Sequence, residues 1–276
     1  MKANYHTHLS LCGHADGMSE DYVKVAIEAG YIDLGMSDHG PIKPEFMSEE
    51  EFKFNWLERQ MTYDEFVNIY LPDCQKTKEK YKNLINFYIG VEIEYLEVYH
   101  EYFVNMRKKL DYMNLGIHYY YHNATMVNSF ENVTYENIQS YGLNAVKAME
   151  TGLFNILVHP DVFMYCYKSK DGSNTFDSEC EKVAHMIIES AIKNNVYLEI
   201  NVGGMFKVTA NNAIPGQFAY PRDEFWQIVS KYKEAKVIIG VDAHSPKNLV
   251  AKEIEMAYQF AKKHNITVLE KVETIV

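Results

Sequence analysis

The chain has 276 residues, 47% of them hydrophobic, which is enough for a sizeable core in one large domain or two small ones. A formal net charge of −11 at pH 7 argues against a protein that coats nucleic acid or binds an anionic membrane surface. Four scattered cysteines without a Cys-x-x-Cys pair predict a reducing compartment. We recognise neither a signal peptide nor an apolar run long enough to span a bilayer, so we expect a cytoplasmic protein.

Apolar strands and amphipathic helices alternate along the whole chain. Strands are expected at residues 5–9, 32–36, 85–92, 112–117, 156–158, 196–200 and 237–241. Helices are expected at residues 19–29, 63–83, 98–109, 137–152, 179–194, 223–232 and 248–264. No Pro/Ser-rich linker interrupts this pattern, so we expect a single domain over residues 1–276. Such alternation predicts an α/β fold with parallel strands, either a closed or distorted barrel or a doubly wound open sheet.

Polar side chains follow the apolar run at nearly every predicted strand end. In chain order they are His6, His8, His14, His39, Glu92, His118, His159, Asn201, Asp242 and His244. A barrel brings all its carboxyl strand ends to one face, whereas an open sheet concentrates function at one switch point. Because these residues are distributed over the whole chain, the pattern favours the barrel.

The residue types at these strand ends indicate a metal site. His6 and His8 are two residues apart, so their side chains leave the same face of a strand, and Asp242 and His244 repeat that spacing. Seven of the 11 histidines occupy strand-end positions. Nine ligand-type residues are too many for one tetrahedral zinc ion and suit two or three divalent ions. Ligand type does not separate Zn from Mn or Fe.

Three positions near these residues leave alternatives open. Glu92 is preferred to Glu94 as a ligand because it ends the apolar run, and a carboxylate can bridge two cations. Cys12 is an option as a soft ligand, but packing against the site is the preferred interpretation because imidazole and oxygen donors dominate the neighbourhood. The segments at residues 46–57 and 203–220 are expected to wall the pocket.

Six motifs in chain order resemble those of the PHP (polymerase and histidinol phosphatase) family, and stand-alone histidinol-phosphate phosphatases in particular. They are His-Thr-His-Leu-Ser-Leu-Cys-Gly-His-Ala (6–15), Ser-Asp-His-Gly-Pro (37–41), Gly-Val-Glu (90–92), Leu-Val-His-Pro-Asp (157–161), Leu-Glu-Ile-Asn (198–201) and Gly-Val-Asp-Ala-His-Ser-Pro (240–246). The resemblance covers essentially the whole chain. It implies a distorted (β/α)7 TIM-like barrel with a two- or three-metal site at the C-terminal ends of the strands.

The resemblance also implies how the ligands divide among the metals. One ion would take His6, His8, Glu92 and Asp242. A second would share Glu92 and take His118 and His159. A third would take His14, His39 and His244, with Asp16 as the alternative ligand. Asp38 and Asp161 flank ligands and are expected either to orient imidazoles or to cap loops.

The activity implied by the resemblance is hydrolysis of a small phosphate monoester, with L-histidinol phosphate as the leading substrate. Metal ions would activate a water molecule, and Glu92, Asp242 and His244 are the candidate catalytic residues. Candidate substrate or phosphate contacts are Lys207, Arg222, Lys43 and Asn201. Lys207 stands where the family tends toward arginine, and it lacks the bidentate fork that arginine offers a phosphate.

Two other functions remain open at this point. A phosphodiesterase or exonuclease is disfavoured, because the chain is acidic and lacks a basic stripe interleaved with aromatic residues. A non-catalytic metal-binding module is disfavoured because all nine ligand residues are present. The sequence does not indicate an oligomeric state.

Overall fold

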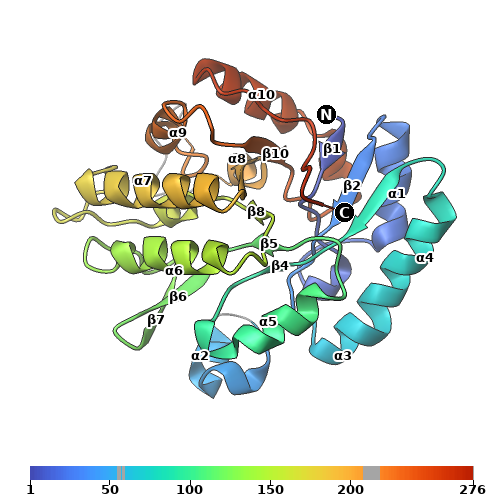
Figure 1. Ribbon diagram of the computed structural model, residues 1–276, viewed down its shortest axis with the longest axis horizontal. Helices are drawn as coiled ribbons and strands as arrows, with labels where there is room; N and C mark the ends of the chain where they lie inside the picture. Colours follow the sequence, from blue (N-terminus) through green and yellow to red (C-terminus); the bar gives the residue numbers. More distant parts are fainter. Residues whose placement is uncertain (55–56, 58–59, 208–217, 276) are drawn as a thin grey trace.

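Short parallel strands lie at the centre of the computed structural model, which describes residues 1–54, 57, 60–207 and 218–275, and helices surround them (Figure 1). The strands are β1 (Ala3–Asn4), β2 (Asp33–Met36), β3 (Asn86–Ile89), β4 (Glu92–Ile93), β5 (Asn114–Leu115), β6 (Tyr119–His122), β7 (Thr125–Asn128), β8 (Ile156–Leu157), β9 (Tyr197–Asn201) and β10 (Val237–Gly240). The α-helices are α1 (Ser19–Glu28), α2 (Glu49–Phe54), α3 (Tyr63–Glu65), α4 (Leu71–Tyr81), α5 (His100–Arg107), α6 (Ile138–Glu150), α7 (Ser178–Lys193), α8 (Gly203–Phe206), α9 (Asp223–Val229) and α10 (Glu253–Lys263). A π-helical turn, η4 (Phe66–Tyr70), joins α3 to α4, and short 3-10 helices are η1 (Ser10–Cys12), η2 (Pro44–Phe46), η5 (Glu97–Tyr99), η6 (Val162–Tyr165) and η7 (Pro246–Val250).

The strands form two parallel sheets and one antiparallel hairpin. The sheet orders are β1-β2-β3 and β10-β9-β8-β5-β4, and β6 pairs with β7. Isolated parallel bridges, Thr7 with Ala243 and His39 with Glu92, link the two sheets just beyond the strand ends. These pairings confirm the predicted α/β fold with parallel strands, and they bring together the carboxyl ends of strands from both sheets.

Apolar burial on both faces explains why the parallel strands are stable. All five residues of β9 are buried, as expected for a parallel strand covered on each side. Helix α7 buries Cys180, Val183, Ala184, Ile187 and Ile188, which lie on one face at helical spacing. It packs against α6 and α9 (Figure 1). Among the described residues, no helix is both long and apolar enough to cross a membrane.

The first predicted strand is wrong in its position. Strand β1 ends at Asn4, and the predicted 5–9 segment contributes only the Thr7 bridge. The Asn4 Nδ2 group donates to the His6 carbonyl at 3.0 Å and to Thr7 Oγ1 at 2.7 Å. These side-chain hydrogen bonds hold the chain just after β1. The segment still bonds through its backbone to Ser37 and Ala243, so it places His6 and His8 beside the ends of both sheets.

The hairpin of β6 and β7 was not predicted from the sequence. Its two-residue turn consists of Asn123 and Ala124, whose φ angles are 49° and 62°. Two positive φ values are typical of the turn that matches the twist of a two-stranded hairpin. An asparagine in this turn between aromatic and β-branched residues is the signal that predicts it.

Replacing Asp177 by alanine should destabilise the fold by about 1–3 kcal/mol. Its Oδ1 caps α7 by accepting from the backbone of Glu179 and Cys180, and its Oδ2 accepts from the buried Tyr167 hydroxyl at 2.7 Å. Asp177→Asn retains a capping oxygen and should lose less. Urea denaturation of both variants measures this difference, and equal losses would contradict the capping role.

Candidate metal and active site

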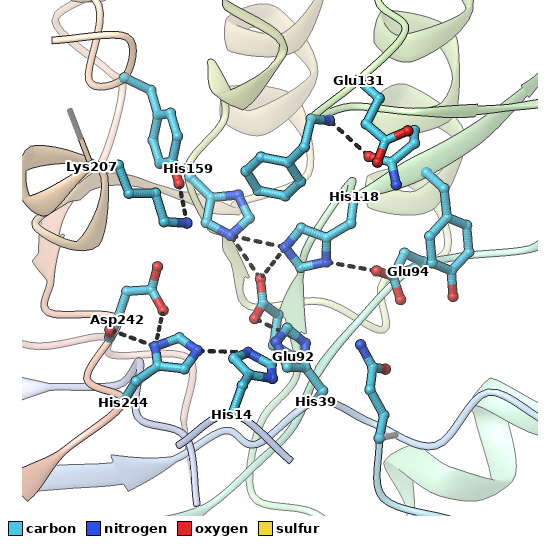
Figure 2. A pocket seen from close by; sticks show the side chains of 15 residues that line it. His14, His39, Glu92, Glu94, His118, Glu131, His159, Lys207, Asp242 and His244 are labelled. Atoms are coloured by element: carbon cyan, nitrogen blue, oxygen red, sulfur yellow. Dashed lines mark hydrogen bonds and ion pairs between the residues drawn. The ribbon is translucent and has the colours of Figure 1, made fainter. Parts of the chain in front are cut away.

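The nine predicted ligand residues converge at the carboxyl ends of the strands. Seven of them line a cavity of about 290 Å³: His14, His39, Glu92, His118, His159, Asp242 and His244. His6 and His8 lie behind this surface and are 1% and 0% exposed. Figure 2 shows the labelled histidines pointing toward Glu92 and Asp242 from different elements. Residues that are up to 238 positions apart in the sequence, from His6 to His244, thus meet at one point.

The carboxylate of Glu92 lies at the centre of the cluster and is 1% exposed. Its Oε2 atom is 3.2 Å from His6 Nε2, 3.3 Å from His8 Nε2 and 3.5 Å from His39 Nδ1. Its Oε1 atom is 2.8 Å from His159 Nε2 and 3.2 Å from His118 Nε2. The two oxygens of one carboxylate therefore face two different sets of imidazoles.

Five overlapping groups of three side chains have ligand atoms within 4.8 Å of one another: His6/His8/Glu92, His6/His159/Asp242, Glu92/His118/His159, His14/His39/His244 and His8/Cys12/His244. The first four combine the residues that the family resemblance assigns to metals. Asp16 belongs to none of these groups in the described part of the chain. Cys12 is close enough to contribute, but its thiol points to the Leu9 carbonyl at 3.2 Å.

Contacts between imidazole nitrogens show that this donor set fits divalent cations. His118 Nε2 lies 3.3 Å from His159 Nε2, and His244 Nε2 lies 3.1 Å from His14 Nε2. Among the described residues, the ring nitrogens of the buried His8 make no hydrogen bond of good geometry, although Nε2 lies 3.2 Å from Asp242 Oδ1 and 3.3 Å from Glu92 Oε2. Buried polar atoms are normally satisfied, and a neutral imidazole is the commonest metal ligand. A shared cation accounts for both the facing nitrogens and the orphaned ones.

Two carboxylates outside the predicted ligand set orient histidines. Glu199 Oε1 accepts from His6 Nδ1 at 2.7 Å, and its Oε2 accepts from the His159 backbone at 3.0 Å and from Asn201 Nδ2 at 2.8 Å. Glu94 Oε1 accepts from His118 Nδ1 at 2.7 Å. Carboxylates at the far nitrogen fix the tautomer and the ring orientation of a ligating histidine. Sequence reasoning missed Glu199, although a carboxylate inside an apolar strand was the available signal.

The two other expected carboxylates, Asp38 and Asp161, both accept from backbone N–H groups, Asp38 from that of His39 at 2.9 Å. Asp38 Oδ1 lies 3.6 Å from His8 Nδ1, which is beyond hydrogen-bond distance. Asp161 Oδ2 accepts from the Arg222 backbone at 2.5 Å and from Trp226 Nε1 at 3.2 Å. Asp161 therefore anchors the start of α9 and does not orient an imidazole. Of its two expected roles, it has the loop-capping one.

Two glycines leave room for the carboxylates of this site. A Cβ atom on Gly240 would lie 1.7 Å from Glu199 Oε1, and one on Gly203 would lie 2.4 Å from Asp242 Oδ2. Both distances are far below any van der Waals contact, so only glycine allows these carboxylates their positions. Two ligand residues also have unusual backbones, with φ values of 32° at His159 and 54° at Asp242. Such conformations are sparsely populated and cluster at functional sites.

The pKa shifts of the histidines go in two directions, because burial lowers them and nearby carboxylates raise them. Burial would raise the pKa of Glu92, but the surrounding imidazoles, His118 first, hold it well below its usual range. Burial would lower the pKa of His118, but Glu92 and Glu94 raise it to about 10. Burial and the charge of His8 lower the pKa of His244 to about 3. Near pH 7 the metal-free chain thus carries a protonated His118 and a neutral His244.

Of the predicted substrate contacts, the structure brings only Lys207 to the described cavity. Its Nζ atom donates to Tyr220 Oη at 2.8 Å and lies 5.0 Å from the centre of the Phe130 ring. Residues 55–56 and 208–217, which belong to the two expected pocket-wall segments (46–57 and 203–220), lie outside the described residues. The flanking Gln60, Lys207 and Tyr220 do line the cavity.

The other three predicted contacts have partners within the protein, and their role as substrate contacts stays a prediction. Lys43 Nζ pairs with Glu45 at 3.5 Å and lies over the rings of Tyr63 and Tyr102. Arg222 is 3% exposed, and its guanidinium donates to Glu224 at 3.1 Å and to the Asn174 carbonyl at 3.2 Å. The fully buried Asn201 bridges Glu199 and the Gly204 backbone. None of them lines the cavity within the described part of the chain.

Comparison with known proteins shows the family of the chain. Residues 4–203 match the PHP domain, so the chain belongs to the PHP domain family and the predicted resemblance is confirmed. A Schizosaccharomyces pombe protein described as "Probable histidinol-phosphatase" is 24% identical over 292 residues, which cover 99% of this chain and 90% of that protein.

Two crystal structures have folds similar to that of this chain. HisK from Listeria monocytogenes has a TM-score of 0.72 at 18% identity, with 92% of this chain and 99% of that chain covered. Histidinol phosphate phosphatase from Lactococcus lactis, complexed with Zn, L-histidinol and phosphate, has a TM-score of 0.68 at 16% identity, with 97% of this chain and 95% of that chain covered. At these identities the likeness establishes the fold.

Replacing Glu199 by glutamine should weaken metal binding by about 10- to 100-fold. Glutamine has one acceptor oxygen, whereas Glu199 accepts from three donors. The ring of His6 would therefore lose its fixed orientation. Competition with a chromogenic chelator measures the affinity, and the exposed Glu234→Gln on the turn before β10 is the charge-matched control. Unchanged affinity in Glu199→Gln would show that the carboxylate does not hold His6 for metal.

Metal binding should release about one proton per chain, or more, at pH 7.5. The affinity for metal should rise with pH. The physical reason is that the raised pKa of His118, about 10, keeps this imidazole protonated in the metal-free chain, so an incoming cation must displace the proton. Calorimetric titration in buffers of different ionisation enthalpy counts the protons. A binding heat independent of the buffer would contradict this prediction.

Proposed function

We propose that the chain is a metal-dependent phosphomonoesterase that hydrolyses L-histidinol phosphate to L-histidinol and phosphate. The proposal rests on the convergence of seven histidines, Glu92 and Asp242 on a cavity that also contains Lys207. Membership of the PHP domain family and the description of the S. pombe relative support this reaction and substrate. The histidinol and phosphate in the L. lactis neighbour agree with it.

We propose further that the two sheets are parts of one distorted (β/α)7 barrel within a single domain of residues 1–276. Strands β3 and β4 are separated only by Gly90 and Val91, so one extended segment passes from the first sheet to the second. The bridge between Thr7 and Ala243 links the edge of the first sheet at β1 to the edge of the second sheet at β10. Counting β3 with β4 as one gives seven parallel strand positions in the two sheets.

The site would hold two or three divalent ions, with Zn, Mn and Fe as the candidates. His6, His8, Glu92 and Asp242 would hold one ion, Glu92 with His118 and His159 a second, and His14, His39 and His244 a third. When bound, these ions would act as Lewis acids toward the phosphoryl oxygens and lower the pKa of a water molecule. The His14 group is the most exposed of the three, so it offers an opening toward solvent.

Residues of the chain would position the substrate and move the proton. Lys207, held by Tyr220, would bind a phosphoryl oxygen as a point charge. The Asp242 carboxylate lines the cavity, with Oδ1 3.2 Å from His8 Nε2 and 3.3 Å from His244 Nδ1. It is placed to accept a proton from the attacking water and to return it to the leaving alkoxide, with His244 as its partner.

Metal-loaded protein should hydrolyse L-histidinol phosphate and lose this activity on chelation. Lys207→Met should raise KM by roughly tenfold, because it removes the cation beside the phosphate. Lys43→Met, which alters a lysine away from the cavity, should leave KM unchanged. Phosphate release from a panel of monoesters measures these values. Failure to hydrolyse any monoester would refute the proposed function.

A further inference from the structure

Lys207 and Tyr220 place two polar groups side by side on one wall of the described cavity. Both residues line this cavity, and Figure 2 shows the Lys207 side chain pointing toward the histidine cluster. Apart from histidines, Lys207 is the one basic side chain among the described lining residues. Its Nζ atom donates to Tyr220 Oη at 2.8 Å, so the two atoms are close enough to contact the same phosphate group.

We propose that Tyr220 binds the phosphoryl group directly, and that its hydroxyl and the Lys207 ammonium group act together as a fork of two donors. This inference rests on the proposed function and deepens it, because it adds a second substrate contact at the phosphate. An arginine offers a phosphate two parallel donors in a rigid fork, whereas a lysine is a compact point charge. A phenol held beside the ammonium group restores a second donor at a fixed position.

The hydroxyl of Tyr220 still has a proton to donate. A phenol is both a donor and an acceptor and is protonated at pH 7, whereas an ammonium group only donates. Because Oη accepts from Lys207 Nζ, its own O–H bond must point away from that nitrogen. Among the described residues, Lys207 is the one hydrogen-bond partner of this oxygen. A phosphoryl oxygen in the cavity would accept the proton that the described protein groups leave unused.

Close packing fixes the ring of Tyr220 in the cavity wall. A Cβ atom on Gly204 would lie 2.2 Å from the Tyr220 carbonyl oxygen and 2.5 Å from its ring, so only glycine leaves room for the ring there. The ring also packs at steep angles against His159, Phe130 and Tyr165, with centroid distances of 6.1, 6.4 and 6.3 Å. A side chain that is already fixed loses little conformational freedom on binding, so its hydrogen bond adds to affinity.

The backbone that follows Tyr220 is fixed by the buried carboxylate of Asp161. Its Oδ2 atom accepts from the Arg222 backbone at 2.5 Å and from Trp226 Nε1 at 3.2 Å. Asp161 and Trp226 are both fully buried. Only Pro221 lies between Arg222 and Tyr220, and its ring restricts the backbone there. Both the ring and the following backbone of Tyr220 are therefore held in place without the use of its hydroxyl proton.

Binding of inorganic phosphate to the zinc-loaded protein tests the proposal without any turnover. Tyr220→Phe keeps the ring and its packing, and it should weaken phosphate binding by about tenfold, the scale of one lost hydrogen bond to a charged group. Tyr258→Phe on α10, which alters a tyrosine away from the cavity, should bind phosphate like the wild type. Isothermal titration calorimetry measures the affinity, and the zinc content should be equal in all three proteins. Unchanged affinity in Tyr220→Phe would overturn the proposal.

A double variant separates direct contact with phosphate from support of Lys207. If the phenol itself donates to phosphate, Tyr220→Phe should weaken binding by about tenfold in the Lys207→Met background as well. A tyrosine that only holds the lysine would have no further effect once the lysine is removed. That result would overturn the proposal.

Hydrolysis separates this proposal from the proposed function. Tyr220→Phe should lower kcat/KM for L-histidinol phosphate and for glycerol phosphate by the same factor of about ten, because the phosphoryl group is common to both esters. A loss confined to L-histidinol phosphate would place Tyr220 against the leaving group and overturn the proposal. Wild-type protein that binds phosphate through Tyr220 but hydrolyses no monoester would support the phosphate contact and refute the proposed function.

Discussion

A carboxylate buried among imidazoles is the constraint on which the site depends. Glu92 is almost completely removed from water, and an isolated carboxylate in such a place would be costly. Five histidines face its two oxygens, and partial protonation of these histidines offsets its charge in the metal-free chain. Divalent cations would supply this compensation when bound. The protein therefore has a site whose electrostatic balance improves when protons are exchanged for metal.

The fold makes this arrangement possible by distributing its parts over many strand ends. Histidines from distant segments meet because the carboxyl ends of both parallel sheets lie together. The rigid neighbours of the cluster come from the same strands: Glu199 lies within β9, and Gly240 at the end of β10 leaves space for it. The hairpin of β6 and β7 adds the wall that carries Tyr119 and leads into Glu131.

Much of this site is predictable from sequence because ligand residues follow strand ends at recognisable spacings. His6 with His8 and Asp242 with His244 were found from their spacing and residue chemistry, although both pairs lie just beyond the strands. The role of Glu199 was not predictable in this way, since its partner His6 is 193 residues away. The directions of long basic side chains were the least predictable: Arg222 and Lys43 pair with the nearby carboxylates Glu224 and Glu45, and neither lines the described cavity. The first strand was misplaced because the regular pairing of β1 ends at Asn4, whose side chain bonds to His6 and Thr7, and only Thr7 forms a further bridge.

The central claim is that the Glu92 carboxylate bridges two metal positions. Anomalous scattering from crystals grown with Zn or Mn locates bound ions directly and distinguishes them from water. We expect one ion against His6, His8 and Asp242 and a second against His118 and His159, each in contact with a different oxygen of Glu92. A single ion, or two ions neither of which contacts Glu92, would contradict it.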